Sequence, residues 1–180
     1  MKKKSMQEME RISEEQYRVV PGMDVTIVLD NIRSMMNTGS VFRTADAFRS
    51  KQIFLCGFTA TPPHREIHKT ALGATESVKW EYRSDCAALL KELRTQGALV
   101  VAVEQVHGSI SLDHWTPDPG QPLVLVFGNE VEGIQQEVLQ ECEYALEIPQ
   151  YGTKHSLNIA VSAGIVLWET YKKFRHQIQS

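Results

Sequence analysis

The chain has 180 residues, of which 42% are apolar, and it carries a formal net charge of −3. This length and composition suffice for one well-packed core, so we expect a single domain. No apolar run approaches the roughly 20 residues of a membrane-spanning helix, and the N-terminal residues lack the apolar stretch of a signal peptide.

The first half of the chain alternates helix-like and strand-like segments. Ser5–Glu8 resembles a capping box and predicts a short N-terminal helix. Val25–Leu29 is β-branched and continuously apolar, as buried parallel strands are. Asn37–Phe48 has the apolar spacing of a helix, Gln52–Cys56 predicts the next strand, and Thr61–Lys69 is expected to be a basic, proline-containing loop.

The second half continues the alternation. Ser84 is expected to cap a helix through Arg94 that ends at Gly97. Three further strands are predicted, over Ala98–Val103, Leu123–Phe127 and Tyr144–Ile148. A long closing helix is expected over Ser156–Phe174. This order predicts an α/β fold, a mostly parallel sheet with helices on both faces.

Charge is distributed unevenly along the chain. Residues 126–150 contain six acids and no lysine or arginine, so a total of −3 leaves +3 for the remainder. Residues 31–83 contain eight basic against four acidic side chains. This pattern is compatible with a local phosphate-binding surface and equally with an ordinary solvated surface. The three cysteines, Cys56, Cys86 and Cys142, form no CxxC pair and predict reduced thiols in a cytoplasmic protein without a metal site.

Three polar segments interrupt these elements. In the segment 31–43, Asn37 precedes Arg43 by six residues, and alone these two residues are also explained as a helix cap and a surface charge. In the segment 125–133, an apolar strand ends in Gly128 and then Glu130, which also suits a plain turn with a solvated acid. In the segment 148–158, a glycine loop leads into a helix, where Ser156 is a candidate cap and backbone N–H groups favour polar or anionic ligands.

Taken together, the three segments resemble the three motifs of the SpoU/TrmH family, the SPOUT-class RNA 2′-O-ribose methyltransferases. The first motif pairs an asparagine with an arginine six residues on, as Asn37 and Arg43 do. The second is Gly-x-Glu-x-x-Gly, and its positions are filled by Gly128, Glu130 and Gly133. The third is matched by Ile148, Pro149, Gly152, Ser156, Leu157 and Asn158. The resemblance covers residues from about Val25 to Phe174, and it is greatest to the TrmH branch, which methylates a D-loop guanosine of tRNA.

The resemblance implies a C-terminal deep trefoil knot, a rare exception to unknotted topology. It also implies that S-adenosylmethionine binds in the knot loops, largely through backbone groups. The cofactor-binding residues would be Val103, Glu104, Phe127, Gly128, Asn129, Gly133, Ile148, Gly152, Ser156 and Leu157.

The reaction implied by the resemblance is in-line methyl transfer to a ribose 2′-oxygen. Family accounts make Arg43 the group that activates the hydroxyl, but a guanidinium stays protonated in proteins. We therefore expect Arg43 to hold a substrate phosphate and to stabilise negative charge on the ribose oxygen. The remaining catalytic positions would be Asn37, Glu130, Ser156 and Asn158.

The expected partner is RNA, and the resemblance to the TrmH branch implies tRNA. Phosphate contacts are expected from Arg33, Arg43, His64, Arg65, Lys69 and Lys154. Only about 24 residues precede the first expected strand, so a separate ribosomal-RNA-binding domain is not expected. The short tail after Phe174 places the chain between TrmH and the knot-only enzymes that modify the tRNA wobble ribose. We divide the chain into a helical extension, residues 1–20, and a methyltransferase domain, residues 21–180.

Three alternatives remain at this stage. The same chemistry is possible at the wobble ribose of tRNA or on rRNA, and a knotted protein without activity would bind RNA only.

The resemblance also implies a homodimer, because the family forms homodimers with the active site beside the interface. The apolar closing helix suits such an interface, although burial in a monomer core explains it equally well.

Overall fold

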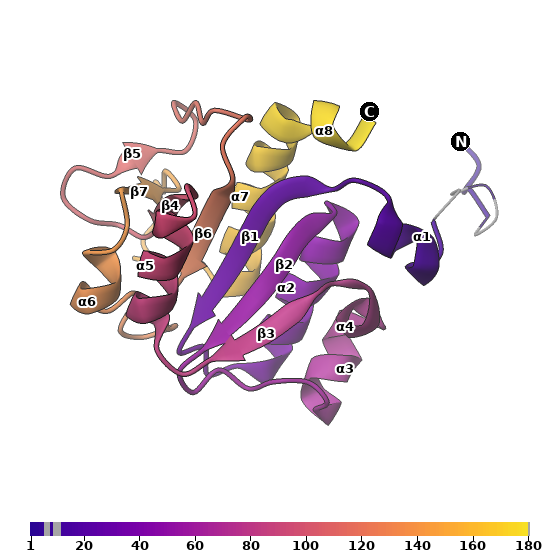
Figure 1. Ribbon diagram of the computed structural model, residues 1–180, viewed down its shortest axis with the longest axis horizontal. Coiled ribbons are helices and arrows are strands. Elements are labelled where there is room, and N and C mark those ends of the chain that lie inside the picture. The colour runs from indigo at the N-terminus through magenta and orange to yellow at the C-terminus, as the bar shows by residue number, and fades with distance from the viewer. Residues whose placement is uncertain (6–7, 9–11, 180) are drawn as a thin grey trace.

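The computed structural model describes residues 1–5, 8 and 12–179, and its centre is a seven-stranded parallel sheet (Figure 1). The strand order is β3-β2-β1-β6-β4-β7-β5, and every paired neighbour is parallel. The strands are β1 (Met23–Asp30), β2 (Ser50–Cys56), β3 (Trp80–Arg83), β4 (Leu99–Val103), β5 (Ile110–Ser111), β6 (Leu123–Phe127) and β7 (Tyr144–Glu147).

Helices cover both faces of this sheet. They are α1 (Glu14–Val19), α2 (Met35–Ala47), α3 (Arg65–Ala71), α4 (Ala74–Ser77), α5 (Cys86–Thr95), α6 (Gln136–Leu139), α7 (Ile159–Phe174) and α8 (His176–Gln179). In Figure 1, α5 and α6 lie on the near face, and α2, α3, α4 and α7 lie on the far face. The α/β class predicted from the sequence, with helices on both faces, is therefore confirmed.

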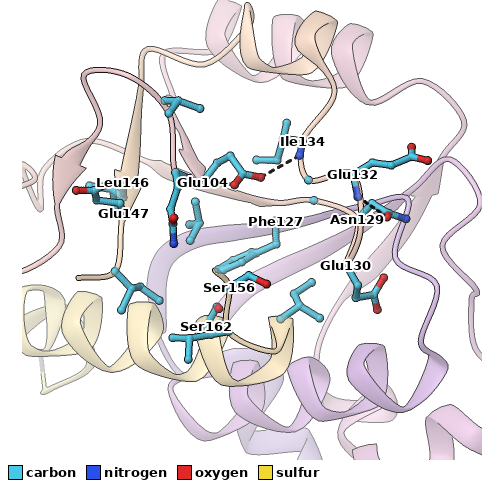
Figure 2. A pocket seen from close by; sticks show the side chains of 18 of the residues that line it. Glu104, Phe127, Asn129, Glu130, Glu132, Ile134, Leu146, Glu147, Ser156 and Ser162 are labelled. Carbon is cyan, nitrogen blue, oxygen red and sulfur yellow. Dashed lines mark hydrogen bonds between the residues drawn. The ribbon is translucent and has the colours of Figure 1, made fainter. Parts of the chain in front are cut away.

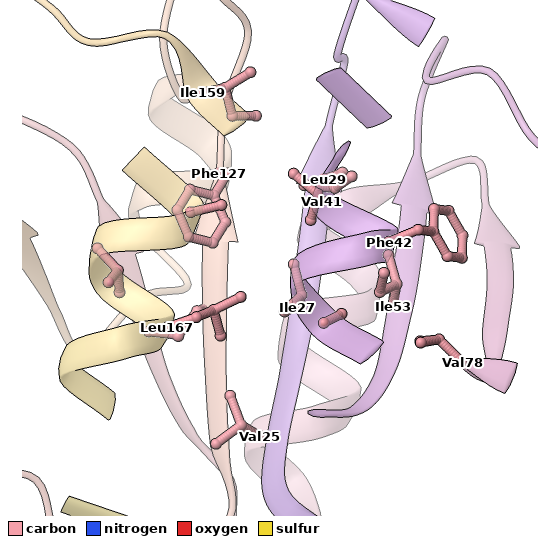
Figure 3. Close-up of a cluster of buried hydrophobic side chains, with 14 of the residues drawn as sticks. Val25, Ile27, Leu29, Val41, Phe42, Ile53, Val78, Phe127, Ile159 and Leu167 are labelled. Atoms are coloured by element: carbon pink, nitrogen blue, oxygen red, sulfur yellow. The ribbon is translucent and has the colours of Figure 1, made fainter. Parts of the chain in front are cut away.

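The strands are apolar on both sides because both sides are covered. In β1, Val25, Ile27 and Leu29 face the core under α2 and α7, whereas Val28 packs with the α5 side. This split follows from the alternation of side chains along a strand. Figure 3 shows the larger core between the sheet and α2 and α7, where Phe42 is fully buried. Burying one such side chain contributes about 1.5–3 kcal/mol to stability.

The central strands match the sequence predictions closely. β6 has the predicted bounds, and β1, β2, β4 and β7 differ from theirs by only one or two residues at an end. The helix predicted to end at Gly97 does end there, with a glycine φ of +90° directly after the cap residue. Such a backbone conformation favours glycine at the end of a helix.

Three helix starts were predicted wrongly. Asn37 does not cap α2, because Ser34 does so and its side chain accepts from the Asn37 N–H. Asp85 replaces Ser84 as the cap of α5. The closing helix begins at Ile159 with Asn158 as its cap, so Ser156 lies outside it.

Other segments also differ from expectation. The basic loop predicted over residues 61–69 is helical from Arg65 onward. The short edge strands β3 and β5 were not predicted. At the N-terminus, Ser5 and Glu8 make the two hydrogen bonds of a capping box, but residues 6–7 and 9–11 of the predicted helix lie outside the described residues.

The remaining expectations about organisation stay predictions. The trefoil knot is consistent with the sheet order but is not itself established by that order. The division at residue 20 is likewise untested, although Tyr17 of α1 packs against the larger core. In the described part of the chain, no helix is both long and apolar enough to cross a membrane.

Candidate methyl-donor and RNA site

The cavity that the motif residues line, which we call the main cavity, lies at the carboxyl ends of β4, β6 and β7, where open parallel sheets bind ligands (Figure 2). Its volume is about 420 Å³, within the roughly 300–1,000 Å³ of small-molecule sites. Nine of the ten residues predicted to bind cofactor line it: Val103, Glu104, Phe127, Gly128, Asn129, Gly133, Ile148, Ser156 and Leu157. Gly152 is the exception, because it is exposed and lies outside the lining.

The segment after β6, which we call the 128–134 loop, is fixed by its own hydrogen bonds. The backbones of Asn129 and Gly133 bond to each other in both directions, at 3.1 and 3.0 Å. The Asn129 side-chain oxygen accepts from the N–H groups of Val131 and Glu132, at 2.8 and 3.0 Å. This arrangement closes the loop without help from a ligand.

Glu104, which follows β4, anchors the same loop from the other side of the cavity. Its Oε2 accepts from the Ile134 N–H at 3.1 Å, the dashed contact in Figure 2, and its Oε1 accepts from the Gln105 N–H. The carboxylate therefore holds the cavity wall in addition to lining it.

Two glycines are required by this packing. A Cβ on Gly128 would lie 2.5 Å from both Gly133 C and Ile134 N. A Cβ on Gly133 would lie 2.4 Å from Glu104 Oε2, and Gly133 also has a φ of +70°. The Gly-x-Glu-x-x-Gly pattern thus reflects a backbone that folds back on itself with no room for side chains.

Glu130 joins the second motif to the first. Its Oε1 accepts from Asn37 Nδ2 at 3.0 Å and from the Ser34 N–H at 3.1 Å. Its Oε2 accepts from the Arg33 N–H at 2.9 Å. Asn37 Oδ1 in turn accepts from Asn158 Nδ2 at 3.1 Å, so residues of all three motifs form one chain of hydrogen bonds.

These donors change the protonation of Glu130. Partial burial on its own raises the pKa of this carboxyl group, but the hydrogen bonds from Arg33, Asn37 and Ser34 outweigh it and lower the pKa below the usual value. Glu130 is therefore an ionised acceptor at neutral pH, which suits it to orienting donors rather than to supplying a proton.

Arg43 is not part of this hydrogen-bonded chain. It is exposed on α2, and no hydrogen bond or ion pair joins it to another residue that the structure describes. Its guanidinium is therefore free to hold a phosphate. Ser156 is exposed and lines the cavity, and its side chain has no hydrogen-bond partner among the described residues.

The other residues predicted to contact RNA lie in three places: just before α2, in or directly before α3, and in the loop before α7. Arg33 is 57% exposed and lies 3.9 Å from Glu132 in a weak ion pair. His64 caps α3 by accepting the Glu66 N–H, and Lys69 pairs with Glu66 at 2.7 Å. Arg65 and Lys154 are exposed. Because α3 packs against α2, the helices that carry Arg65, Lys69 and Arg43 lie on the same face of the sheet (Figure 1).

The lining favours a particular kind of ligand. Four carboxylates line the cavity, and among the described residues no lysine or arginine does so. A ligand rich in phosphate would be repelled there, whereas a cationic ligand would be attracted. Nor do three His, Cys, Asp or Glu side chains gather anywhere in the described ranges in a way that could hold a metal ion.

The sequence did not identify every residue of the site. Ser34 and Arg33 supply backbone donors to Glu130, and no signal in the sequence marks them. Leu146, Glu147 and Gln105 also line the cavity, and each lies within two residues of the end of a predicted strand, which is a usable signal.

This fold and site define an α/β protein with a glycine-loop pocket at the strand ends, where proteins of this class bind small ligands. The chain belongs to the SpoU rRNA Methylase family, whose model matches residues 24–168. The predicted SpoU/TrmH membership is thereby confirmed.

Similar proteins fall in the same family. The chain is 32% identical over 147 residues to the 23S rRNA (guanosine-2′-O-)-methyltransferase RlmB of Nitrosomonas europaea, covering 82% of this chain and 55% of the relative. An AdoMet-bound rRNA methyltransferase from Sinorhizobium meliloti superposes with a TM-score of 0.77 at 29% identity, covering 87% of this chain and 59% of that one. A solved structure that concerns the 2-OH methylation of C/U34 on tRNA has a TM-score of 0.74 at 28% identity. The match covers 84% of this chain and 97% of that one.

The match is partial for the relatives. The chain spans 58–61% of the length of the first curated relatives that it matches.

Proposed function

We propose that this chain is an S-adenosylmethionine-dependent RNA 2′-O-ribose methyltransferase. The observation that carries the proposal is the hydrogen-bonded chain Glu130–Asn37–Asn158, which unites three separate motifs beside the main cavity. Family membership supplies the reaction class, and this contact gives a physical reason for the residues to occur together.

The main cavity suits S-adenosylmethionine. When bound, this molecule supplies a methyl group on a positively charged sulfonium. Glu104, Glu130, Glu132 and Glu147 give the lining a negative character that attracts such a cation. Apolar contact is available from Phe127, Leu146 and Ile148, and the 128–134 loop offers backbone groups. Gly152 does not line the cavity, so its expected contribution is limited to the backbone of the neighbouring loop.

The chain's own residues then position the acceptor. Glu130, held ionised, keeps Asn37 and the start of α2 in place. Asn37 and Asn158 orient the ribose, and Ser156 lies at the cavity wall. Arg43 binds a phosphate and stabilises negative charge on the 2′-oxygen, because a guanidinium does not give up its proton at neutral pH.

We propose a D-loop guanosine of tRNA as the substrate. The TrmH-like motifs and the exposed cations Arg33, Arg43, Arg65, Lys69 and Lys154, with His64, support it. Two alternative substrates have specific support. The RlmB relative is named for a guanosine of 23S rRNA, which supports rRNA. The other similar structure concerns C/U34 of tRNA, which supports the wobble ribose. A cytoplasmic location is part of the proposal, since the three cysteines are free thiols.

A homodimer completes the proposal. One face of the closing helix and its approach is apolar and exposed, through Leu157 (37%), Val161 (49%), Ile165 (38%) and Trp168 (51%). Contiguous apolar exposure of this kind is typical of interfaces. Light scattering of the wild type and of Val161→Asp tests it: a dimer that the substitution dissociates supports the assignment, and a monomeric wild type contradicts it.

The function is tested by incubating the protein with methyl-labelled S-adenosylmethionine and, separately, total tRNA and total rRNA. We expect label in a 2′-O-methylated nucleoside, and mapping that nucleoside decides between the D loop, the wobble position and rRNA. Cofactor binding without incorporation into either RNA would favour the alternative of an inactive RNA-binding protein. Arg43→Lys should reduce transfer at least tenfold, because an ammonium lacks the bidentate geometry.

A further inference from the structure

A second cavity, of about 500 Å³, lies beside the main one and is not used by the proposed reaction. It is at the carboxyl ends of β1, β2 and β3, and it shares Asn129, Glu132 and Gly133 with the main cavity. The 128–134 loop is therefore a wall common to both. Anything bound in the second cavity would lie next to the proposed ribose site at Glu130.

The second cavity contains a buried carboxylate oxygen without a partner. Asp30, the last residue of β1, is 2% exposed. Its Oδ1 accepts from Asn31 Nδ2 at 3.1 Å, whereas its Oδ2 has no hydrogen-bond partner among the described residues. Buried polar atoms are nearly always hydrogen-bonded, so an unpaired one in a cavity wall points to an absent donor.

Burial also affects the protonation of Asp30. It raises the pKa of this carboxyl group, which disfavours the ionised form, and the nearby Cys86 thiol and the Asn31 amide oppose that effect without reversing it. A thiol is only a weak donor. N–H groups of a ligand would stabilise the ionised carboxylate that burial disfavours.

The remaining lining indicates what such a ligand is. The cavity is acidic, with Asp85, Glu132 and Glu137 beside Asp30, and among the described residues no lysine or arginine lines it. A phosphate is therefore disfavoured, and no metal-holding group of side chains is present in the described ranges. Phe58 lines the cavity and is 60% exposed, with its backbone N–H fixed by the Asn31 side chain at 3.2 Å.

An acceptor-rich wall with an exposed aromatic ring matches a nucleobase. Proteins read unstacked RNA bases by stacking them on aromatic rings and hydrogen-bonding their edges. Carboxylates accept from exocyclic amino groups. Guanine offers one carboxylate two adjacent donors, the N1–H and the N2 amino group, whereas uracil offers only its N3–H, and cytosine and adenine each offer one exocyclic amino group with no ring N–H beside it.

We propose that this second cavity receives the guanine base of the nucleotide whose ribose is methylated, with Asp30 accepting from its Watson–Crick edge and Phe58 stacking on its ring. The inference rests on the proposed function, since it takes the substrate to be RNA. Asp30 and Phe58 are then specificity-determining residues, and they contact no part of the methyl donor.

Binding of mononucleotides tests the cavity without any methyl transfer. In ¹⁵N-labelled protein, guanosine 5′-monophosphate should shift the Asn31 side-chain amide and the Phe58 backbone amide. Inosine monophosphate, which lacks the N2 amino group, should bind at least several-fold more weakly, and uridine monophosphate should cause no such shift. Equal shifts from all nucleotides, or none from any, would overturn the proposal.

Two variants then link the cavity to the reaction. Phe58→Ala, at an exposed position that leaves the fold intact, and Asp30→Asn should each raise KM for the RNA that the wild type labels, by about tenfold or more. Binding of S-adenosylmethionine should stay unchanged, and Asp118→Asn is the matched control on the surface.

The outcomes separate this inference from the proposed function. If the wild type methylates RNA but neither variant changes KM, the base cavity is wrong and the function stands. If guanosine monophosphate binds selectively but no RNA is methylated, the cavity stands and the proposed function fails. Should Asp30→Asn not fold, Phe58→Ala and the nucleotide series still decide the matter.

Discussion

Two loops border the main cavity, and they are built in opposite ways. The 128–134 loop is closed by reciprocal backbone bonds, by the Asn129 side chain and by Glu104, and it has no room for a Cβ at Gly128. Residues 151–158 are all exposed, and a Cβ on Gly152 would meet nothing within 4 Å. One wall is preorganised, and the other is free to adjust around a ligand.

The contrast has an electrostatic side as well. The rigid wall presents Glu130 and Glu132 to the cavity, whereas the exposed loop brings Lys154 and His155 to the outside. Under the proposed function, the methyl donor would lie against the rigid, acidic wall and the RNA against the exposed, basic loop. Substitutions at matched positions of the two loops should therefore differ in kind and in size.

Gly128→Ala should have the largest effect. The added methyl group would overlap Gly133 and Ile134, and overpacking of this kind costs about 1–3 kcal/mol. Urea unfolding should show that loss, and calorimetry should show that S-adenosylmethionine binding is weakened at least tenfold. An unchanged affinity would mean that the wall is less rigid than its hydrogen bonds imply.

Glu130→Gln should come next. An amide keeps one acceptor oxygen and turns an N–H₂ group toward backbone donors, which costs about 1–3 kcal/mol. Glu132→Gln is the control, because its ion pair with Arg33 is exposed and such pairs contribute at most about 1 kcal/mol.

The effect of Glu130→Gln should also depend on pH. The pKa of Glu130 is lowered in the folded protein, so its stabilisation is fully present above the unfolded value near 4.5 and is lost as the pH falls through the folded value. The stability difference between wild type and variant, measured by urea unfolding, should thus be constant from pH 7 to about 5. It should narrow below about pH 4. A difference that persists there would contradict the assigned protonation.

Asn158→Ala should have a smaller effect on stability, about 1 kcal/mol, because it removes the cap of α7. Asn158→Asp separates two roles, since it keeps the acceptor for the Ala160 N–H but loses the donor to Asn37. We expect thermal unfolding of the Asp variant to stay near that of the wild type while methyl transfer falls as in the Ala variant. Full transfer by Asn158→Asp would show that the contact with Asn37 is dispensable.

Gly152→Ala should have the smallest effect. Its surroundings are open and its φ is not in the left-handed region, so a methyl group fits. Such a change alters stability by less than about 1 kcal/mol, and in the stabilising direction where the backbone is compatible. Cofactor affinity should change less than twofold by calorimetry. A large loss would mean that this loop, too, is fixed around the ligand.

The sequence specified the buried sheet better than its boundaries. β6 could be predicted residue by residue because a run of five apolar residues buried on both faces has one good explanation. The helix caps could not, because Ser34, Asn37, Ser84 and Asp85 are all good capping residues and only packing chooses among neighbours. The edge strands β3 and β5 are short and partly exposed, so they lack the apolar signal.

The candidate site shows a similar limit. The motif positions predicted which residues line the main cavity, since glycines and strand ends mark it. They did not predict that Glu130 accepts from Asn37, because that contact depends on β1 and β6 being neighbours in the sheet. They also did not indicate the cavity at Asp30. That cavity is recognised by the unpaired Oδ2 of Asp30, which only the structure shows.

The contact between Glu130 and Asn37 has a consequence for how activity arises during synthesis. It spans 93 positions of the chain, and the contact between Asn158 and Asn37 spans 121. Contacts at such separations form late and slowly, because a long loop must close first. A nascent chain that has emerged only as far as β4 would hold Asn37 without Glu130 and Asn158, the two residues that orient its side chain. If the proposed function holds, the chain should therefore stay inert toward RNA until the residues up to Asn158 are in place.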